Sequence, residues 1–194
     1  MRSFTSSSIN DDFPGGALVS KGIGRNYGIE ITFEKFFTHN FYFLITHSLF
    51  NSQYQPLDGN WYSTRYNNNY ITNLVGGKEW LIRGKNILGV NTRFTWSGGR
   101  RDTPLDLSHL NEYGYYDPAQ TQRNAKVMKD YLRCDLGISY KVNKPRVSYK
   151  YKIDVQNVTN RANEAGVFYN DVLEKEVVYT LQGILPSFSF QVFF

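Results

Sequence analysis

The stretch that decides the fold is YLRCDLGISYKV, residues 131–142. Its even positions are all apolar, whereas its odd positions are mostly polar or charged. Alternation at a period of two residues is typical of a β-strand with one apolar and one polar face. After the turn NKPR (143–146), the stretch VSYKYKIDVQN (147–157) repeats the pattern. Each stretch has about the 9–11 residues that a tilted strand needs to cross a membrane. Together they predict a long antiparallel hairpin.

The same alternation recurs along the chain, and no segment shows the spacing of an amphipathic helix. We predict seven antiparallel strands, at 18–37, 41–54, 69–82, 86–98, 127–142, 147–157 and 174–194, with Gly183 and Pro186 forming a bulge in the last. Short turns at 38–40, 83–85 and 143–146 alternate with long polar loops at 54–68, 99–126 and 158–173. Short turns at one end and long loops at the other are typical of outer-membrane barrels.

Two environments for the apolar faces remain open: the interior of a soluble barrel or sandwich, or membrane lipid. Charged residues occupy the polar phase in mid-strand, namely Glu30, Glu34, Arg93, Arg133, Asp135, Lys150, Lys152 and Asp154. Aromatic residues gather at the edge where the short turns lie, as in an aromatic girdle: Phe36, Phe37, Phe41, Trp80, Phe193 and Phe194. The girdle favours lipid. We therefore expect lipid contact for Leu132, Leu136, Ile138, Ile153, Val155, Phe188 and Phe190.

Composition and motifs argue against several other classes. The 22 Lys and Arg residues are scattered and the net charge is only +5, so no basic stripe for nucleic acid is indicated. Cys134 is the single cysteine, and no apolar run is long enough for a transmembrane helix. His39, His47 and His109 lack metal-ligand spacing, and no catalytic constellation is found. We expect no enzyme activity, no metal and no cofactor.

Several ordered motifs resemble the C-terminal part of TonB-dependent outer-membrane receptors, particularly those of Bacteroidota. The motifs are GIEITFEKFF (28–37), TWSGGRRDTPLD (95–106), DYLRCDLGISYKVN (130–143) and the closing LPSFSFQVFF (185–194). The resemblance implies a barrel of about 22 strands, plugged by an N-terminal domain. It also implies energised substrate uptake in the outer membrane through coupling to TonB. The chain has no recognisable plug, TonB box or signal peptide, so residues 1–194 correspond to an incomplete C-terminal part of such a barrel.

The resemblance also suggests roles for particular residues. Phe188, Phe190 and Phe194 resemble the C-terminal signal that the barrel-assembly machinery recognises. The long loops are the expected place for ligand contacts, because aromatic and Arg residues are favoured at binding hot spots. The candidates are Trp61, Tyr62, Arg65, Tyr66, Arg100, Arg101, Tyr113, Tyr115 and Tyr116.

We expect the chain to contribute lumen wall and extracellular loops to TonB-dependent substrate uptake. Its partners would be outer-membrane lipid, the barrel-assembly machinery, the missing N-terminal barrel and plug, and TonB through that missing part alone. A small self-contained outer-membrane barrel and a soluble barrel binding an apolar ligand are the alternatives. Because single-chain outer-membrane barrels have an even number of strands, an odd count predicts that residues 1–17 end an external loop. It also predicts that the isolated chain aggregates and forms no pore.

Overall fold

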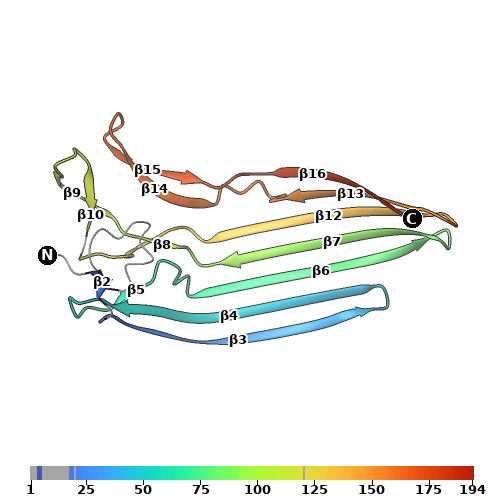
Figure 1. Cartoon of the computed structure of the whole chain (residues 1–194), viewed down its shortest axis with the longest axis horizontal. Coiled ribbons are helices and arrows are strands. Elements are labelled where there is room, and N and C mark those ends of the chain that lie inside the picture. Colours follow the sequence, from blue (N-terminus) through green and yellow to red (C-terminus); the bar gives the residue numbers. More distant parts are fainter. Residues whose placement is uncertain (1–3, 6–17, 20, 120) are drawn as a thin grey trace.

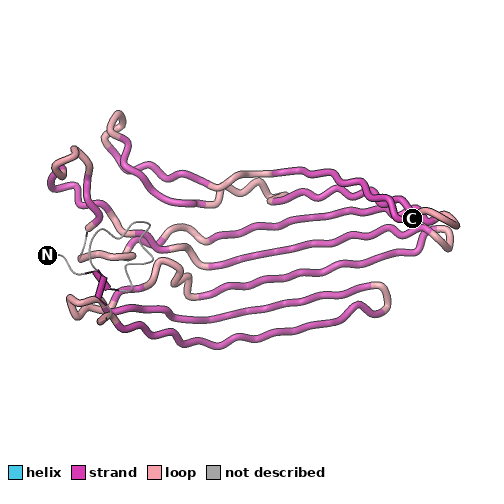
Figure 2. Tube along the Cα trace, in the orientation of Figure 1, coloured by secondary structure: helices cyan, strands magenta, loops and turns pink. Residues whose placement is uncertain are grey.

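The long strands form one antiparallel sheet, open at both edges (Figures 1 and 2). A computed structural model describes residues 4–5, 18–19, 21–119 and 121–194. Its main sheet has the order β16-β13-β12-β7-β6-β4-β3. These strands are β3 (Ile23–Thr38), β4 (Phe41–Gln55), β6 (Tyr70–Ile82), β7 (Asn86–Ser97), β12 (Tyr131–Asn143), β13 (Ser148–Gln156) and β16 (Leu185–Phe193). The all-β class and the seven antiparallel long strands are confirmed.

Shorter strands occur at the loop end of the sheet (Figure 1). They are β1 (Phe4–Thr5), β2 (Leu18–Val19), β5 (Tyr62–Ser63), β8 (Arg101–Asp102), β9 (Leu105–Leu110), β10 (Tyr116–Pro118), β11 (Lys126–Val127), β14 (Glu164–Asn170) and β15 (Lys175–Thr180). The described residues contain no helix. Accordingly, no helix long and apolar enough to cross a membrane is found among them.

The strand registers bring the apolar phases of all seven strands to one face of the sheet. Ile138 lies opposite Val90 on one side and Ile153 on the other, and Ile153 in turn lies opposite Phe188. The polar phases meet in the same way on the other face, where Asp135 lies opposite Arg93 in the strand register. Because a slip of one residue would exchange the two faces of a strand, this agreement across six strand pairs supports each predicted phase.

The apolar face is not packed into a hydrophobic interior. Among the described residues, the buried hydrophobic side chains are only Met128 and Ala165, and neither belongs to a long strand. Ile138 is 54% exposed and Phe188 67% exposed, and Leu136, Ile153 and Phe190 are exposed as well. Leu132 and Val155 are half-buried. A face of this kind needs a covering that the sheet itself does not provide.

The short turns lie at one end of the sheet and the long connections at the other (Figure 1). His39 and Asn40 both have positive φ, 52° and 63°, as a type I′ hairpin turn requires. Arg83 and Gly84 adopt the same region in the turn between β6 and β7. The third turn joins β12 to β13 at residues 144–147. The predicted separation of turns and loops is therefore confirmed.

Several strand boundaries differ from the sequence prediction. The strand expected from residue 18 begins at Ile23, and β2 pairs in parallel with β1 instead. The strand expected from residue 127 begins at Tyr131, because Lys126 and Val127 pair with β8. Asn143, expected in a turn, is the last residue of β12. The long loops also contain short strands. Apart from Phe4 and Thr5, the proposed external loop at 1–17 lies outside the described residues.

The largest correction concerns residues 174–194, which are two strands in different sheets rather than one bulged strand. β15 pairs with β14 in a separate hairpin, whereas β16 pairs with β13. The loop predicted at 158–173 thus contains the strand β14. Between β15 and β16, the Leu181 amide donates to the Asn163 carbonyl and the Ile184 amide to the Asn160 side chain. These bonds direct the backbone away from a continuous ladder.

Candidate functional site

The long connections at the loop end pack against one another. The Arg101 side chain donates to the Asn67 carbonyl at 3.0 Å and to Asn69 Oδ1 at 3.1 Å, and its amide donates to the Arg65 carbonyl. The Asn124 side chain donates to the Ser63 carbonyl at 2.8 Å. The segment 98–130 is therefore joined to the segment 56–69 by four bonds, three of which use backbone acceptors.

A second set of contacts joins the segment 98–130 to the β14–β15 hairpin. Glu164 accepts from the Lys129 amide at 2.9 Å and pairs with Lys129 Nζ at 3.0 Å. Hydrogen bonds from the Lys129 amide and ammonium lower the pKa of Glu164 below its ordinary value. Lys126 pairs with Glu176, and Arg100 donates to the Ala165 carbonyl. These bonds make the loop end a connected platform.

Buried asparagines organise this platform, and the sequence analysis did not identify them. Asn67 is 1% exposed; its side chain accepts from the Ser52 amide and donates to Asn51 and Ser63. Asn163 both accepts from and donates to the backbone of Leu132, at 2.9 Å each. Its side-chain amide thus bonds to β12 as the backbone of a neighbouring strand would. The available signal was the occurrence of Asn at strand ends, where Asn tolerates turn conformations and bonds to nearby backbone.

The structure separates the candidate contact residues into two groups. Tyr62, Arg65, Arg100, Arg101 and Tyr116 are half-buried and engaged in loop packing. Tyr62, for example, donates to Asp58 Oδ2 at 2.8 Å, and burial together with this carboxylate raises its pKa. The Tyr116 ring meets the Tyr169 ring edge-on at 4.6 Å between centroids. Their side chains support the platform rather than present a free binding surface.

The other candidates keep large exposed surfaces. Tyr113 and Tyr115 lie at the tip of the β9–β10 hairpin, 75% and 66% exposed. Trp61 lies beneath the Arg25 guanidinium, 4.2 Å from the ring centroid. Tyr66 is exposed at the mouth of a pocket. The candidates do not form a single cluster. Tyr66 is the one that lines this pocket.

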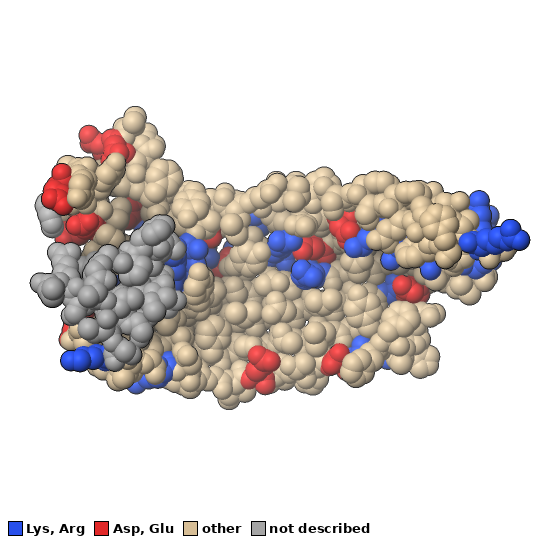
Figure 3. Space-filling model, viewed as in Figure 1, with Lys and Arg blue, Asp and Glu red and all other residues tan. Residues whose placement is uncertain are grey.

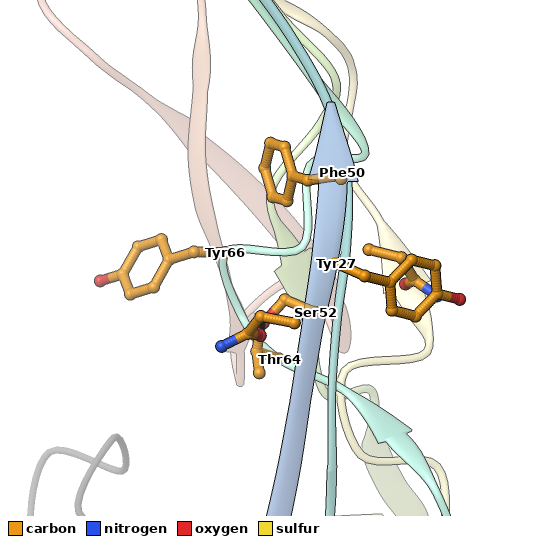
Figure 4. Close-up of a pocket in the computed structure, with 8 residues that line it drawn as sticks. Tyr27, Phe50, Ser52, Thr64 and Tyr66 are labelled. Atoms are coloured by element: carbon orange, nitrogen blue, oxygen red, sulfur yellow. Dashed lines mark hydrogen bonds between the residues drawn. The ribbon is translucent and has the colours of Figure 1, made fainter. Parts of the chain in front are cut away.

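The pocket around Tyr66 lies where β3 and β4 meet the segment 56–69 (Figure 4). It has a volume of about 410 Å³ and is lined by Asn26, Tyr27, Gly28, Phe50, Asn51, Ser52, Thr64 and Tyr66. In the close-up, Phe50 and Tyr66 lie on the same side of β3, and Ser52 and Thr64 lie below them. Ser52 links Asn26 to Thr64 through hydroxyl hydrogen bonds of 2.6 and 3.0 Å. Because no lining residue is charged, the pocket suits an uncharged polar molecule.

A second hollow, of about 330 Å³, follows the polar face of the sheet across β4, β6, β7, β12, β13 and β16. Arg133 pairs with Asp135 at 2.7 Å and donates to Gln156 at 2.9 Å, while Lys152 pairs with Asp154 at 2.8 Å. Gly137 leaves room here for the side chains of its two cross-strand neighbours: a Cβ atom would lie 2.5 Å from oxygens of both. Figure 3 shows mixed blue and red side chains along this region. The sheet therefore has a polar face of mixed charge opposite its apolar one.

The terminal aromatic residues follow the strand alternation. Phe188 and Phe190 lie on the apolar face, where the Phe190 ring is 5.0 Å from that of Tyr151. Phe194 follows the last residue of β16 and is fully exposed. This placement leaves all three side chains accessible.

The histidine and cysteine residues lie on different elements of the fold. His47 Nδ1 lies 2.8 Å from the Thr72 hydroxyl. Within the part of the chain that the structure describes, no group of three His, Cys, Asp or Glu residues is placed to hold a metal ion. Cys134 is half-buried in β12, opposite Phe94.

Comparison with known protein families, with curated proteins and with solved structures finds no match for this chain. Function is therefore inferred from the sheet, its two faces and its loop platform.

Proposed function

We propose that this chain is the C-terminal barrel portion of an outer-membrane receptor of the TonB-dependent type. In this proposal it contributes lumen wall and extracellular loops to substrate uptake and catalyses no reaction. The observation that carries the proposal is the exposed apolar face, shared in register by all seven long strands. A lipid-facing surface opposite a polar lumen is the physical arrangement of an outer-membrane barrel.

The two ends of the sheet support the same proposal. The short turns suit the periplasmic side and the connected loop platform suits the exterior. The hollow of mixed charge on the polar face would line the lumen, and the uncharged pocket near Tyr66 would lie just below the external loops. Both are within reach of a substrate that enters from outside.

The open edges support an incomplete barrel. In a series of seven antiparallel strands, the first and last run in the same direction, so β3 and β16 cannot pair with each other antiparallel. Antiparallel closure requires an odd number of further strands. The N-terminal barrel of the same receptor would supply these strands, its plug would fill the lumen, and the barrel-assembly machinery would insert the whole. TonB would act only through that N-terminal part.

Cysteine labelling in cells of the source organism tests the proposal. In a Cys134→Ser background, Glu112→Cys places a thiol at the β9–β10 tip and Pro145→Cys places one in the turn between β12 and β13; both positions are exposed. A membrane-impermeant maleimide is expected to label Glu112→Cys in intact cells and Pro145→Cys only after the outer membrane is opened. Equal labelling of both in intact cells, or recovery of the protein outside the outer-membrane fraction, would overturn the proposal.

Immunoblotting of the same fractions tests incompleteness. An antibody against the segment 121–130 is expected to detect a band much larger than the 22.5 kDa of this chain. A surface-labelled band of 22.5 kDa would instead favour a small self-contained barrel.

A further inference from the structure

The short-turn end of the sheet carries a cluster of basic side chains. Arg83 and Lys85 lie in the turn between β6 and β7, and Lys144 and Arg146 lie in the turn between β12 and β13. All four side chains are exposed, and neither turn contains an acidic residue. None of the four forms an ion pair with another described residue. Figure 3 shows the blue side chains gathered at this end.

The two basic turns are held side by side. Asn143 donates through its side chain to the Lys85 carbonyl at 2.7 Å, and its amide donates to Asn86 Oδ1 at 3.2 Å. Asn86 is buried and also donates to the Tyr140 hydroxyl at 3.0 Å. The four charges therefore belong to one preformed rim, which we call the basic rim (Arg83, Lys85, Lys144 and Arg146).

Three lysine side chains lie over aromatic rings near the short turns, at the same end of the sheet as the basic rim. Lys35 Nζ lies 4.5 Å from the Phe41 ring centroid, Lys78 Nζ lies 5.4 Å from Trp80, and Lys144 Nζ lies 5.4 Å from Tyr149. Strand register places these aromatic rings on the apolar face. Aromatic rings combined with Lys stems that reach toward water are characteristic of the headgroup level of a bilayer.

The acidic groups at this end lie on the other face. Glu34 and Glu79 belong to the polar phase, where they lie opposite Leu44 and Gly89. Lys141 and Lys150 face each other directly across β12 and β13 on that polar face, which adds to the positive potential. The apolar-face side of the basic rim thus combines cations with aromatic rings, and neither Glu34 nor Glu79 lies on that side.

We propose that the basic rim binds the headgroups of anionic phospholipids in the leaflet that the short turns face. This inference rests on the proposed membrane location. Charge complementarity supports it, because basic residues beside a membrane attract anionic lipids by an electrostatic term that salt screens. The neighbouring rings would place the bilayer interface at the height where the phosphates meet these cations.

Lipid selectivity measured by electron paramagnetic resonance tests the assignment. The protein is extracted from outer membranes together with the strands that complete its barrel and is reconstituted into phosphatidylcholine bilayers that contain either spin-labelled phosphatidylglycerol or spin-labelled phosphatidylcholine, and the motionally restricted fraction of each is measured. We expect phosphatidylglycerol to be favoured about five-fold at low ionic strength, the ratio that one Lys or Arg near a membrane surface supplies. Added salt should reduce this preference. This measurement uses the unaltered protein and needs no variant.

A charge-removal variant and a matched control locate the effect. The rim variant is Arg83→Asn, Lys85→Gln, Lys144→Gln and Arg146→Gln; Asn is chosen at position 83 because φ is 51° there. The control removes the same number of exposed charges from the loop end through Lys21→Gln, Arg25→Gln, Arg161→Gln and Lys175→Gln. The rim variant should lose the preference for phosphatidylglycerol, and the control should keep it.

The outcomes separate this inference from the proposed function. Restricted lipid without any preference for phosphatidylglycerol would overturn the rim assignment and leave the membrane proposal standing. No restricted lipid at all would overturn both. Binding of soluble polyglutamate by the wild-type rim, without lipid preference, would show a protein-docking surface instead and would also overturn the assignment.

Discussion

At the scale of single residues, buried amides determine the shape of the loop end. Asn67 satisfies one backbone amide and two side-chain groups from a nearly fully buried position. A buried group that loses its partner costs about 1–3 kcal/mol. Such residues control the shape of the loop platform from buried positions.

Asn67→Ala is therefore expected to loosen the segment 56–69 by about 1–3 kcal/mol, because the Ser52 amide and Asn51 would lose their partner. Amide hydrogen exchange of the refolded chain, read by mass spectrometry, measures the change. Asn60→Ala is the matched control, since Asn60 is exposed in the same segment. Equal exchange in both variants would show that Asn67 does not organise the loop.

Glu164 gives the loop platform a dependence on pH. Its pKa in the folded chain lies below the ordinary value because of its bonds to Lys129. The ionised carboxylate therefore stabilises the folded loops above the ordinary Glu pKa of about 4.3, and this stabilisation is lost as the pH falls through the lower, folded pKa. The Lys129 amide resonance should titrate with a midpoint below about 4.3 and stop titrating in Glu164→Gln.

Glu112→Gln serves as the control for that titration, because Glu112 is exposed in the β9–β10 tip. It should leave the Lys129 titration unchanged. A Lys129 midpoint at or above the ordinary Glu value, or a titration that persists in Glu164→Gln, would show that the pairing is absent.

At the scale of the strands, each residue's environment depends on its face. Neighbouring positions along β12 therefore have opposite surroundings: Ile138 lies among Val90 and Ile153, whereas Ser139 lies opposite Gly89 and Lys152. The same substitution at these two adjacent positions therefore compares the two faces of the sheet.

In the proposed membrane setting, Ile138→Lys is expected to cost about 2–4 kcal/mol of folded stability, because it places a charge on the lipid-facing surface. Ser139→Lys should cost much less, because it faces the wet side. Urea titration of the vesicle-inserted chain, followed by tryptophan fluorescence, compares the two. If Ile138→Lys were harmless and increased solubility in water, the apolar face would be exposed to solvent, and lipid contact would be wrong.

At the scale of the whole molecule, the open sheet is the main physical problem. β3 presents an unpaired edge of 16 residues and β16 one of 9 residues. Backbone groups without partners cost several kcal/mol each in lipid, and in water they template pairing with other chains. The exposed apolar face adds to this tendency.

The isolated chain should consequently aggregate in aqueous buffer and form no channel after refolding in detergent. Light scattering checks the first expectation, and planar-bilayer conductance with heat-modifiability on gels checks the second. A stable, heat-modifiable monomer with channel activity would show that the sheet closes on itself. In that event the seven-stranded open arrangement would not describe the chain in a membrane.

The long strands and their faces could be determined from the sequence because alternation is a local property. In YLRCDLGISYKV, each side chain's face follows from its parity alone, and tertiary structure confirmed the predicted parity in β3, β7, β12, β13 and β16. The short turns followed equally from local chemistry, with Gly84, Asn40 and Pro145 marking them. The sequence also predicted that the long loops carry exposed aromatic residues.

The packing of that loop end was decided only by the tertiary structure. Asn124 reaches the carbonyl of Ser63, and Lys126 pairs with Glu176, 50 residues away. No local pattern specifies such partners, so sequence reasoning treated Arg101 and Tyr116 as free contact candidates and missed Asn67 and Asn163. For the same reason it joined β15 to β16: both have strand-forming sequences, and only the choice of partner, β14 for one and β13 for the other, separates them. Side-chain alternation is set by each residue's own backbone, whereas pairing depends on which distant segments the whole sheet brings together.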